Sequence, residues 1–229
     1  RPPRSTLFPY TTLFRSNALY GSNALHGIVN VVMPMPGRAD EPHIALELGA
    51  NDFVRARMTL PFKEDTPWFA SAIYTDDGGF REDSGYRQGK IHLKRSWSVA
   101  DGAFTAAFTA TDLRQETASF IYGEDAYKDP SVNRSNPSPE AFRDVSSQRL
   151  YGLWSRSLGD FDLDVRPYLR HSDMEFMHHE LPGQPVEDNG QTSAGVMTAA
   201  TFEGTKLVTI AGLDVEWADA YVRQAQAGP

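Results

Sequence analysis

The chain has 229 residues, of which 40% are apolar and 23% are charged, so it has the composition of a folded protein with room for one or two domains. Its formal net charge of −8 argues against a nucleic-acid partner, and the absence of cysteine excludes disulfides and thiolate metal sites. No apolar run approaches the ~20 residues of a membrane-spanning helix, so a membrane role requires a β-barrel or a surface anchor.

The opening stretch, RPPRSTLFPYTTLFRS, does not fit a secretory signal peptide, because prolines, threonines and Arg15 interrupt its apolar part. It corresponds, codon by codon, to the translation of a DNA string that resembles a widely used sequencing adapter. We therefore predict that Arg1–Ser16 is a translated cloning or assembly artefact. The natural sequence would then begin at Asn17, with its own N-terminus lost.

The next stretch, NALYGSNALHGIVNVVMPMPG, is rich in small residues and ends in an apolar, β-branched run. The run covers Ile28–Met33 and stops at Pro34 and Pro36. This pattern predicts a short helix or turn around Ser22–Leu25, followed by a strand over Gly27–Met33.

After Pro42 the hydrophobic pattern has a period of two, which is typical of strands and not of helices. In FDLDVRPYLR, for example, the odd-numbered positions from Phe161 to Leu169 are apolar except for Pro167, and the even-numbered positions are polar. Most of the nine predicted strands are longer than the ~5–6 residues of a mean globular strand and near the ~9–11 of a membrane strand. They cover 43–50, 52–62, 67–75, 89–99, 103–113, 147–157, 161–171, 192–202 and 206–219.

The connections between these strands alternate in length after a first tight hairpin at Asn51. Short turns such as ADG, LGD and EGT alternate with long polar segments, of which the longest are Leu113–Ser146 and Ser172–Gln191. Outer-membrane barrels have short turns on one rim and long loops on the other. The pattern therefore predicts an antiparallel transmembrane barrel with a polar lumen. A soluble β-sandwich or propeller also gives alternation, but long strands and unequal loops disfavour it.

The segment Leu19–Gly37 resembles the end of the plug domain in TonB-dependent outer-membrane receptors. A second stretch, DGGFREDSGYRQGKIHLKRSW, is similar to the second external loop and returning strand of that family. The plug motif departs mildly from the family at Leu25–His26–Gly27, where glycine pairs are frequent. Its matching residues are Tyr20, Gly21, Ser22, Ala24, Gly27, Val29, Asn30, Val31 and Pro34.

The resemblance implies an all-β fold with two natural parts: the end of a plug domain in 17–37, and a truncated N-terminal part of the barrel in 38–229. About nine of an expected 22 strands are present. The plug residues Tyr20, Gly21, Ser22, Ala24, Gly27 and Asn30 would be structural. Unpaired backbone groups at an open sheet edge cost several kcal/mol each in lipid. We therefore expect that these 229 residues alone do not insert stably.

The resemblance also implies the function and the partners. The chain would be a fragment of a receptor in the outer membrane of a Gram-negative bacterium, with outer-membrane lipid around its barrel. It would take up a scarce nutrient, such as an iron-siderophore or cobalamin, with energy from the TonB complex. The segment that contacts TonB would lie upstream and is missing from this chain. The alternatives are a plugless porin-type passive channel and a secreted β-sandwich binding module.

No residue pattern predicts an enzyme, a cofactor or a metal site. In MHHE, His178 and His179 point to opposite faces of a strand, and the acidic stretches YTDDGG and YGEDAYKD lack calcium-loop spacing. Long loops commonly carry function, so their aromatic residues and arginines are the predicted contacts to an external ligand. These contacts are Phe80, Arg81, Tyr86, Arg87 and Tyr122, with Phe120 and Tyr127 as weaker members of the group.

Aromatic residues near strand ends fit an interfacial girdle: Trp68, Trp97, Phe104, Phe161 and Trp217. The charged residues expected to face the lumen are Arg55, Arg57, Asp162, Asp164 and Arg166. Two residues conflict with a simple barrel strand. Arg95 shares the parity of the lipid-facing residues, so it must snorkel or follow a bulge, and Pro167 removes a backbone donor inside a strand.

Overall fold

A computed structural model describes residues 33–36, 41–62 and 67–226. The chain divides into two compact units, Arg1–Pro34 and Met35–Pro229, and the described strands all belong to the second. The plug motif, the predicted turn at Ser22–Leu25 and Arg1–Ser16 lie outside the described residues, apart from Pro34 at the end of the motif.

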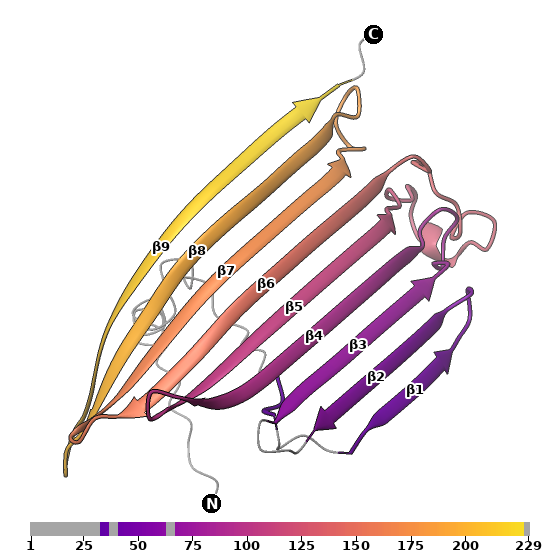
Figure 1. Ribbon diagram of the computed structural model, residues 1–229. Coiled ribbons are helices and arrows are strands. Elements are labelled where there is room, and N and C mark those ends of the chain that lie inside the picture. The colour runs from indigo at the N-terminus through magenta and orange to yellow at the C-terminus, as the bar shows by residue number, and fades with distance from the viewer. Residues whose placement is uncertain (1–32, 37–40, 63–66, 227–229) are drawn as a thin grey trace, which may run out of the picture. The chain divides into compact units, whose positions relative to one another are not determined.

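The described part is one antiparallel sheet of nine strands, in which each strand pairs with its neighbours in the sequence. Figure 1 shows these strands side by side in a curved sheet. The predicted all-β fold and the number of strands are therefore confirmed. The strands are β1 (His43–Leu48), β2 (Val54–Phe62), β3 (Trp68–Asp77), β4 (Tyr86–Val99), β5 (Gly102–Glu116), β6 (Phe142–Ser157), β7 (Phe161–Met177), β8 (Val186–Glu203) and β9 (Val208–Ala225).

Helical structure in the described ranges is limited to one 3-10 turn, η2 (Ala126–Lys128), in the connection between β5 and β6. Among these residues no helix is long and apolar enough to cross a membrane.

The register is constant within each strand pair from β1 to β9, so directly opposed residues of all the strands lie on the same face of the sheet. We call the two sides the apolar face and the polar face. A row of directly opposed residues shows the character of the apolar face: Leu60, Ala70, Leu93, Phe108, Leu150, Leu169, Ala194 and Trp217. The predicted lumen charges Arg55, Arg57, Asp162, Asp164 and Arg166 all lie on the polar face.

Many large side chains of the apolar face are exposed. Leu93, Leu150 and Leu169 are 44%, 50% and 48% exposed. In the described ranges only Phe69, Ala107 and Ala141 are buried apolar residues, so these ranges form no core of the globular type. An apolar surface of this extent is stable against lipid and not against water. The exposed residues therefore form a lipid-facing belt.

Aromatic residues gather at the end of the belt nearest the short turns. The rings of Phe62 and Trp68 stack at 3.7 Å, Trp97 meets Phe104 edge-on at 4.8 Å, and Phe161 lies 5.1 Å from Phe202. Four of the five predicted girdle residues lie at this end. Trp217 lies at the opposite end of the belt, next to Asp219 on the same face of β9.

The strands extend beyond the belt at the other end, and in this region the predicted boundaries were wrong. β7 reaches Met177 where 171 was expected, and β8 begins at Val186 where 192 was expected. The apolar face carries charged residues in this region, such as Asp173 and Asp188, so the alternation of apolar and polar residues ends while the backbone ladder continues. The connections are correspondingly shorter, at Thr117–Ala141 and His178–Pro185.

The boundaries of four other strands also differ from the prediction. β4, β5 and β6 also extend past the predicted spans at this end, to Tyr86, Glu116 and Phe142. β1 is shorter than predicted and ends at Leu48. The tight turn that follows is closed by the bond from Gly49 N to Phe53 O, 2.9 Å.

Both irregular residues fit the sheet without a bulge. The pairing of β4 is continuous, so Arg95 lies on the apolar face, and its guanidinium carbon is 5.9 Å from the Trp97 ring at the aromatic end of the belt. Pro167 interrupts the ladder between β6 and β7 opposite Gly152, and the register then resumes unchanged. A Cβ at Gly152 would lie 3.3 Å from Pro167 Cγ, so glycine makes room for the ring.

Two neighbouring residues of β8 test the assignment of faces. Val196→Arg places a charge in the belt, opposite Pro167 and Val215, and should cost about 2–4 kcal/mol of unfolding free energy in a bilayer. Met197→Arg, on the polar face, should cost less than about 1 kcal/mol. Denaturant unfolding of the whole membrane-inserted protein measures both, and equal costs would contradict the assignment.

Candidate functional site

The end of the sheet beyond the belt, which we call the loop end, carries the tight turn between β1 and β2 and three longer connections. These are Gly49–Phe53, Gly78–Gly85, Thr117–Ala141 and His178–Pro185. They hold each other through backbone bonds, for example from Gly78 N to Asn51 O at 2.8 Å. The loop end is therefore an ordered surface formed by segments that are distant in the sequence.

Arg81 joins the β3–β4 loop to the long β5–β6 loop. Its Nε donates to Ser135 O at 2.8 Å and its Nη1 to Ser119 O at 2.5 Å. Its Nη2 is buried and has no hydrogen-bond partner. A guanidinium supplies five donors in a rigid plane, so one side chain can fix two loop segments at once.

Further bonds between the same loops support this joint. Glu82 N donates to Arg134 O at 2.8 Å, and Asn136 Nδ2 donates to Asp83 O at 2.8 Å. The Arg134 side chain donates to Asn51 Oδ1 at 2.9 Å, and its guanidinium carbon lies 5.1 Å from the Phe80 ring. Each bond spans a large sequence separation, so the loop arrangement depends on tertiary contacts.

The structure brings some predicted ligand contacts together and separates others. Phe80 and Arg81 lie against the β5–β6 loop, which also carries Tyr122, and Tyr122 is 84% exposed. Tyr86 and Arg87 lie on opposite faces of β4. Tyr86 is on the polar face and only partly exposed, whereas Arg87 bonds Asp76 at 3.1 Å on the apolar face.

A cavity of about 350 Å³ at the loop end includes residues that the sequence did not indicate. Phe142 and Phe176 lie at strand ends that were predicted to be loops, and the Arg143 guanidinium carbon is 5.9 Å from the Phe176 ring. The lining residues are Thr117, Ala118, Phe120, Phe142, Arg143, Phe176, Met177, His179 and Glu180. Of these, only Phe120 belonged to the predicted group of ligand contacts.

The histidine pair at the β7–β8 hairpin lies close to carboxylates. His178 Nε2 lies 3.2 Å from Glu187 Oε2, and His178 Nδ1 lies 3.6 Å from Glu180. Hydrogen bonds from Gln224, His178 and Asn189 lower the pKa of Glu187. In the described part of the chain no group of three or more His, Asp or Glu side chains is arranged to hold a metal ion. The hairpin itself is closed by the bond from His178 N to Pro185 O, 2.9 Å.

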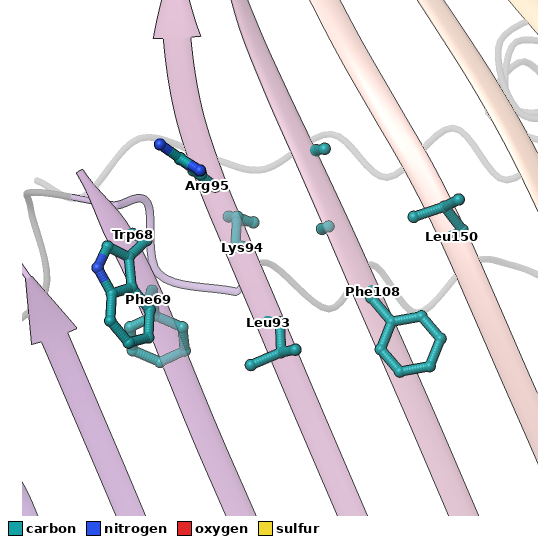
Figure 2. A pocket seen from close by; sticks show the side chains of 9 residues that line it. Trp68, Phe69, Leu93, Lys94, Arg95, Phe108 and Leu150 are labelled. Atoms are coloured by element: carbon teal, nitrogen blue, oxygen red, sulfur yellow. The ribbon is translucent and has the colours of Figure 1, made fainter. Parts of the chain in front are cut away.

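A second depression, of about 510 Å³, lies over β3 to β6. Figure 2 shows Leu93, Phe108 and Leu150 on three successive strands of its wall, with Trp68 and Arg95 nearer the strand ends. These five residues belong to the apolar face. The other lining residues are Ala106 on the same face and Phe69, Lys94 and Ala107 on the polar face, so the depression lies mainly in the lipid-facing belt. We assign the candidate ligand site to the loop end and the polar face.

Comparison with known proteins identifies the fold. No family model and no curated protein matches the sequence. Three solved structures match in fold: FpvA of Pseudomonas aeruginosa bound to a heterologous pyoverdine with iron, the complex of FpvAI with pyocin S2, and the pyoverdine outer membrane receptor FpvA from strain PAO1 bound to pyoverdine. The first and third are 11% identical to this chain, with TM-scores of 0.62 and 0.59, and the second is 12% identical, with a TM-score of 0.62.

These matches cover 81%, 80% and 80% of this chain but only 28%, 28% and 31% of the matched chains. The chain thus spans about three tenths of the solved receptors. At this identity the likeness establishes the fold alone. The resemblance that the sequence shows to TonB-dependent receptors is confirmed at that level: the sheet has the fold of part of such a receptor's barrel.

The role of Arg81 is tested by Arg81→Lys, which keeps the charge but removes the planar donors. Hydrogen bonds to a charged group contribute about 1.5–3 kcal/mol each, so the β5–β6 loop should open more often. Limited proteolysis should then cut within 117–141 at least about tenfold faster. Arg87→Lys, at a side chain that is 72% exposed, is the control and should leave cleavage unchanged. Equal rates in the two variants would show that Arg81 does not hold the loop.

Proposed function

We propose that this chain is a segment of a TonB-dependent outer-membrane receptor that imports a scarce nutrient. The main support is the unbroken nine-stranded sheet, which has one lipid-type face and the fold of a known outer-membrane receptor. The plug-like motif directly before the first strand adds support from the sequence. Its residues Tyr20, Gly21, Ser22, Ala24, Gly27 and Asn30 lie outside the described ranges.

The two faces of the sheet support a location in the outer membrane. The exposed leucines of the strands lie on one face, and the other face carries charged and hydroxyl side chains. A bacterial outer-membrane barrel has a hydrated, polar interior and an apolar exterior that faces lipid. Loops longer than turns occur at only one end of the described sheet, and we propose that this end faces the cell exterior.

We propose transport rather than catalysis. The solved proteins that share this fold are outer-membrane receptors and not enzymes. The proposed cargo is an iron-siderophore or cobalamin, which would first contact the exposed aromatic residues of the loop end. Energy would come from TonB through a plug domain encoded upstream of the barrel.

Of the two alternatives, the secreted β-sandwich lacks support in the described ranges. These ranges form a single sheet, with no second sheet to pack against its apolar face. A plugless passive channel would share the same sheet and loops. It differs only in needing neither the plug segment nor an energy source.

Uptake by cells carrying the complete gene separates these functions. Radiolabelled ferric siderophores and cyanocobalamin are supplied to otherwise identical cells with and without TonB. The receptor should concentrate one of these nutrients only when TonB is present, and removal of the segment Tyr20–Gly27 should abolish that accumulation. Equal uptake without TonB would establish the passive channel. Recovery of the complete product in soluble fractions without detergent would establish the secreted module.

A further inference from the structure

The polar face of β4 to β7 carries positive charge although the chain as a whole is acidic, with a net charge of −8. We define the basic wall as the polar-face positions of these four strands between the Tyr86 row and the Tyr168 row. None of these positions is Asp or Glu. Its cations are Lys90, Lys94, Arg143, Arg149 and Arg170.

At the centre of the basic wall β5 presents only small side chains. Ala107, Thr109 and Thr111 lie between the lysines of β4 and the polar-face residues of β6. Neighbouring strands are ~4.8 Å apart, so Lys90 and Arg149 flank this strip from strands about 10 Å apart. Ala107 is only 2% exposed, so the accessible part of the strip is Thr109 and Thr111, which are partly exposed between the exposed side chains of Lys90 and Arg149.

Arg149 and Arg170 lie directly opposite each other on β6 and β7. Like charges in this position destabilise a sheet unless they are compensated. Arg170 is compensated, because it bonds Glu216 and lies 2.5 Å from Ser193 Oγ. Arg149 has no carboxylate within ion-pair distance in the described ranges, and its guanidinium carbon lies 5.3 Å from the Tyr151 ring.

The compensation of Arg170 depends on Gly195. Tyr168 on β7 and Glu216 on β9 flank Gly195 in one row. A Cβ on residue 195 would lie 2.6 Å from Tyr168 Cζ, so glycine lets the ring lie across β8. Glu216 is thus held beside Arg170, and Arg149 remains as the uncompensated cation of the pair.

The same row as Arg149 and Thr109 contains His92. Its side chain is 5% exposed, and neither ring nitrogen has a hydrogen-bond partner. Buried polar atoms without partners are rare in folded proteins. This row therefore holds a buried imidazole on β4 and an exposed cation on β6.

We propose that the basic wall binds a nutrient with two or more negative charges, presented as carboxylate, catecholate or phosphate oxygens. Arg149 would be the principal contact, and Lys90 would contact the ligand across the β5 strip. The proposal rests on the proposed receptor function and adds the charge class of its cargo. Charge-assisted bonds from a planar guanidinium to such oxygens are strong and directional.

The test uses the complete receptor in detergent and two ferric chelates of similar size: a trianionic tris-catecholate and a neutral tris-hydroxamate. Quenching of tryptophan fluorescence gives the affinities. The wild type should prefer the trianion, and added salt should reduce that preference. Arg149→Gln and Lys90→Gln should each weaken binding of the trianion about tenfold and leave the neutral chelate unchanged.

The matched control is Arg114→Gln, an exposed arginine on the other face of β5, which should change neither affinity. If Arg149→Gln behaves like Arg114→Gln while the wild type still binds and imports a chelate, the basic wall is not the ligand site and the receptor function stands. Equal loss for both chelates would also overturn the proposal, because it would indicate structural damage. A receptor that neither binds nor imports any chelate would refute the proposal together with iron uptake.

Discussion

The structure depends on one constraint: in a bilayer, every backbone N–H and C=O of a spanning sheet must bond to the next strand. The register from β1 to β9 meets this constraint between neighbouring strands, except where Pro167 interrupts the ladder, and it fixes the face of each strand residue. A slip of one residue would turn the leucines of the belt toward water and the arginines of the basic wall toward lipid. Pro167 is accommodated because Gly152 yields space without shifting the register.

The belt and its faces could be predicted from the sequence, because alternation is a local signal. The loop end could not, since it begins where both faces become polar. Phe176 was assigned to a loop for that reason, although it is part of β7. The contacts of Arg81 were not predictable either, because its acceptors are backbone carbonyls of residues far along the chain, at Ser119 and Ser135.

The basic wall was missed for a different reason. Arg149 and Arg170 face each other only because the hairpin between β6 and β7 sets their register, and Glu216 arrives from β9. Each residue by itself matched the expectation of a polar lumen residue. The cations of the basic wall and several acidic residues lie on different faces of the sheet, and this separation can be recognised only when the pairing of the strands is known. The acidic residues Asp144, Asp173 and Asp188 lie on the other face, beyond the belt.

The edge of the belt nearest the loop end does not follow a single row of paired residues. On β3 it lies beyond Tyr74, whereas on β9 it already ends at Trp217, which belongs to a row nearer the short turns. The strands are therefore inclined to the membrane normal, and partners in one row sit at different depths. Arg95 and Val215 belong to the same row, but Arg95 is closer to the edge of the belt at the short turns, where an arginine costs less. On the apolar face, the cost of a charge thus depends on its depth in the bilayer, and it differs between partners in one row.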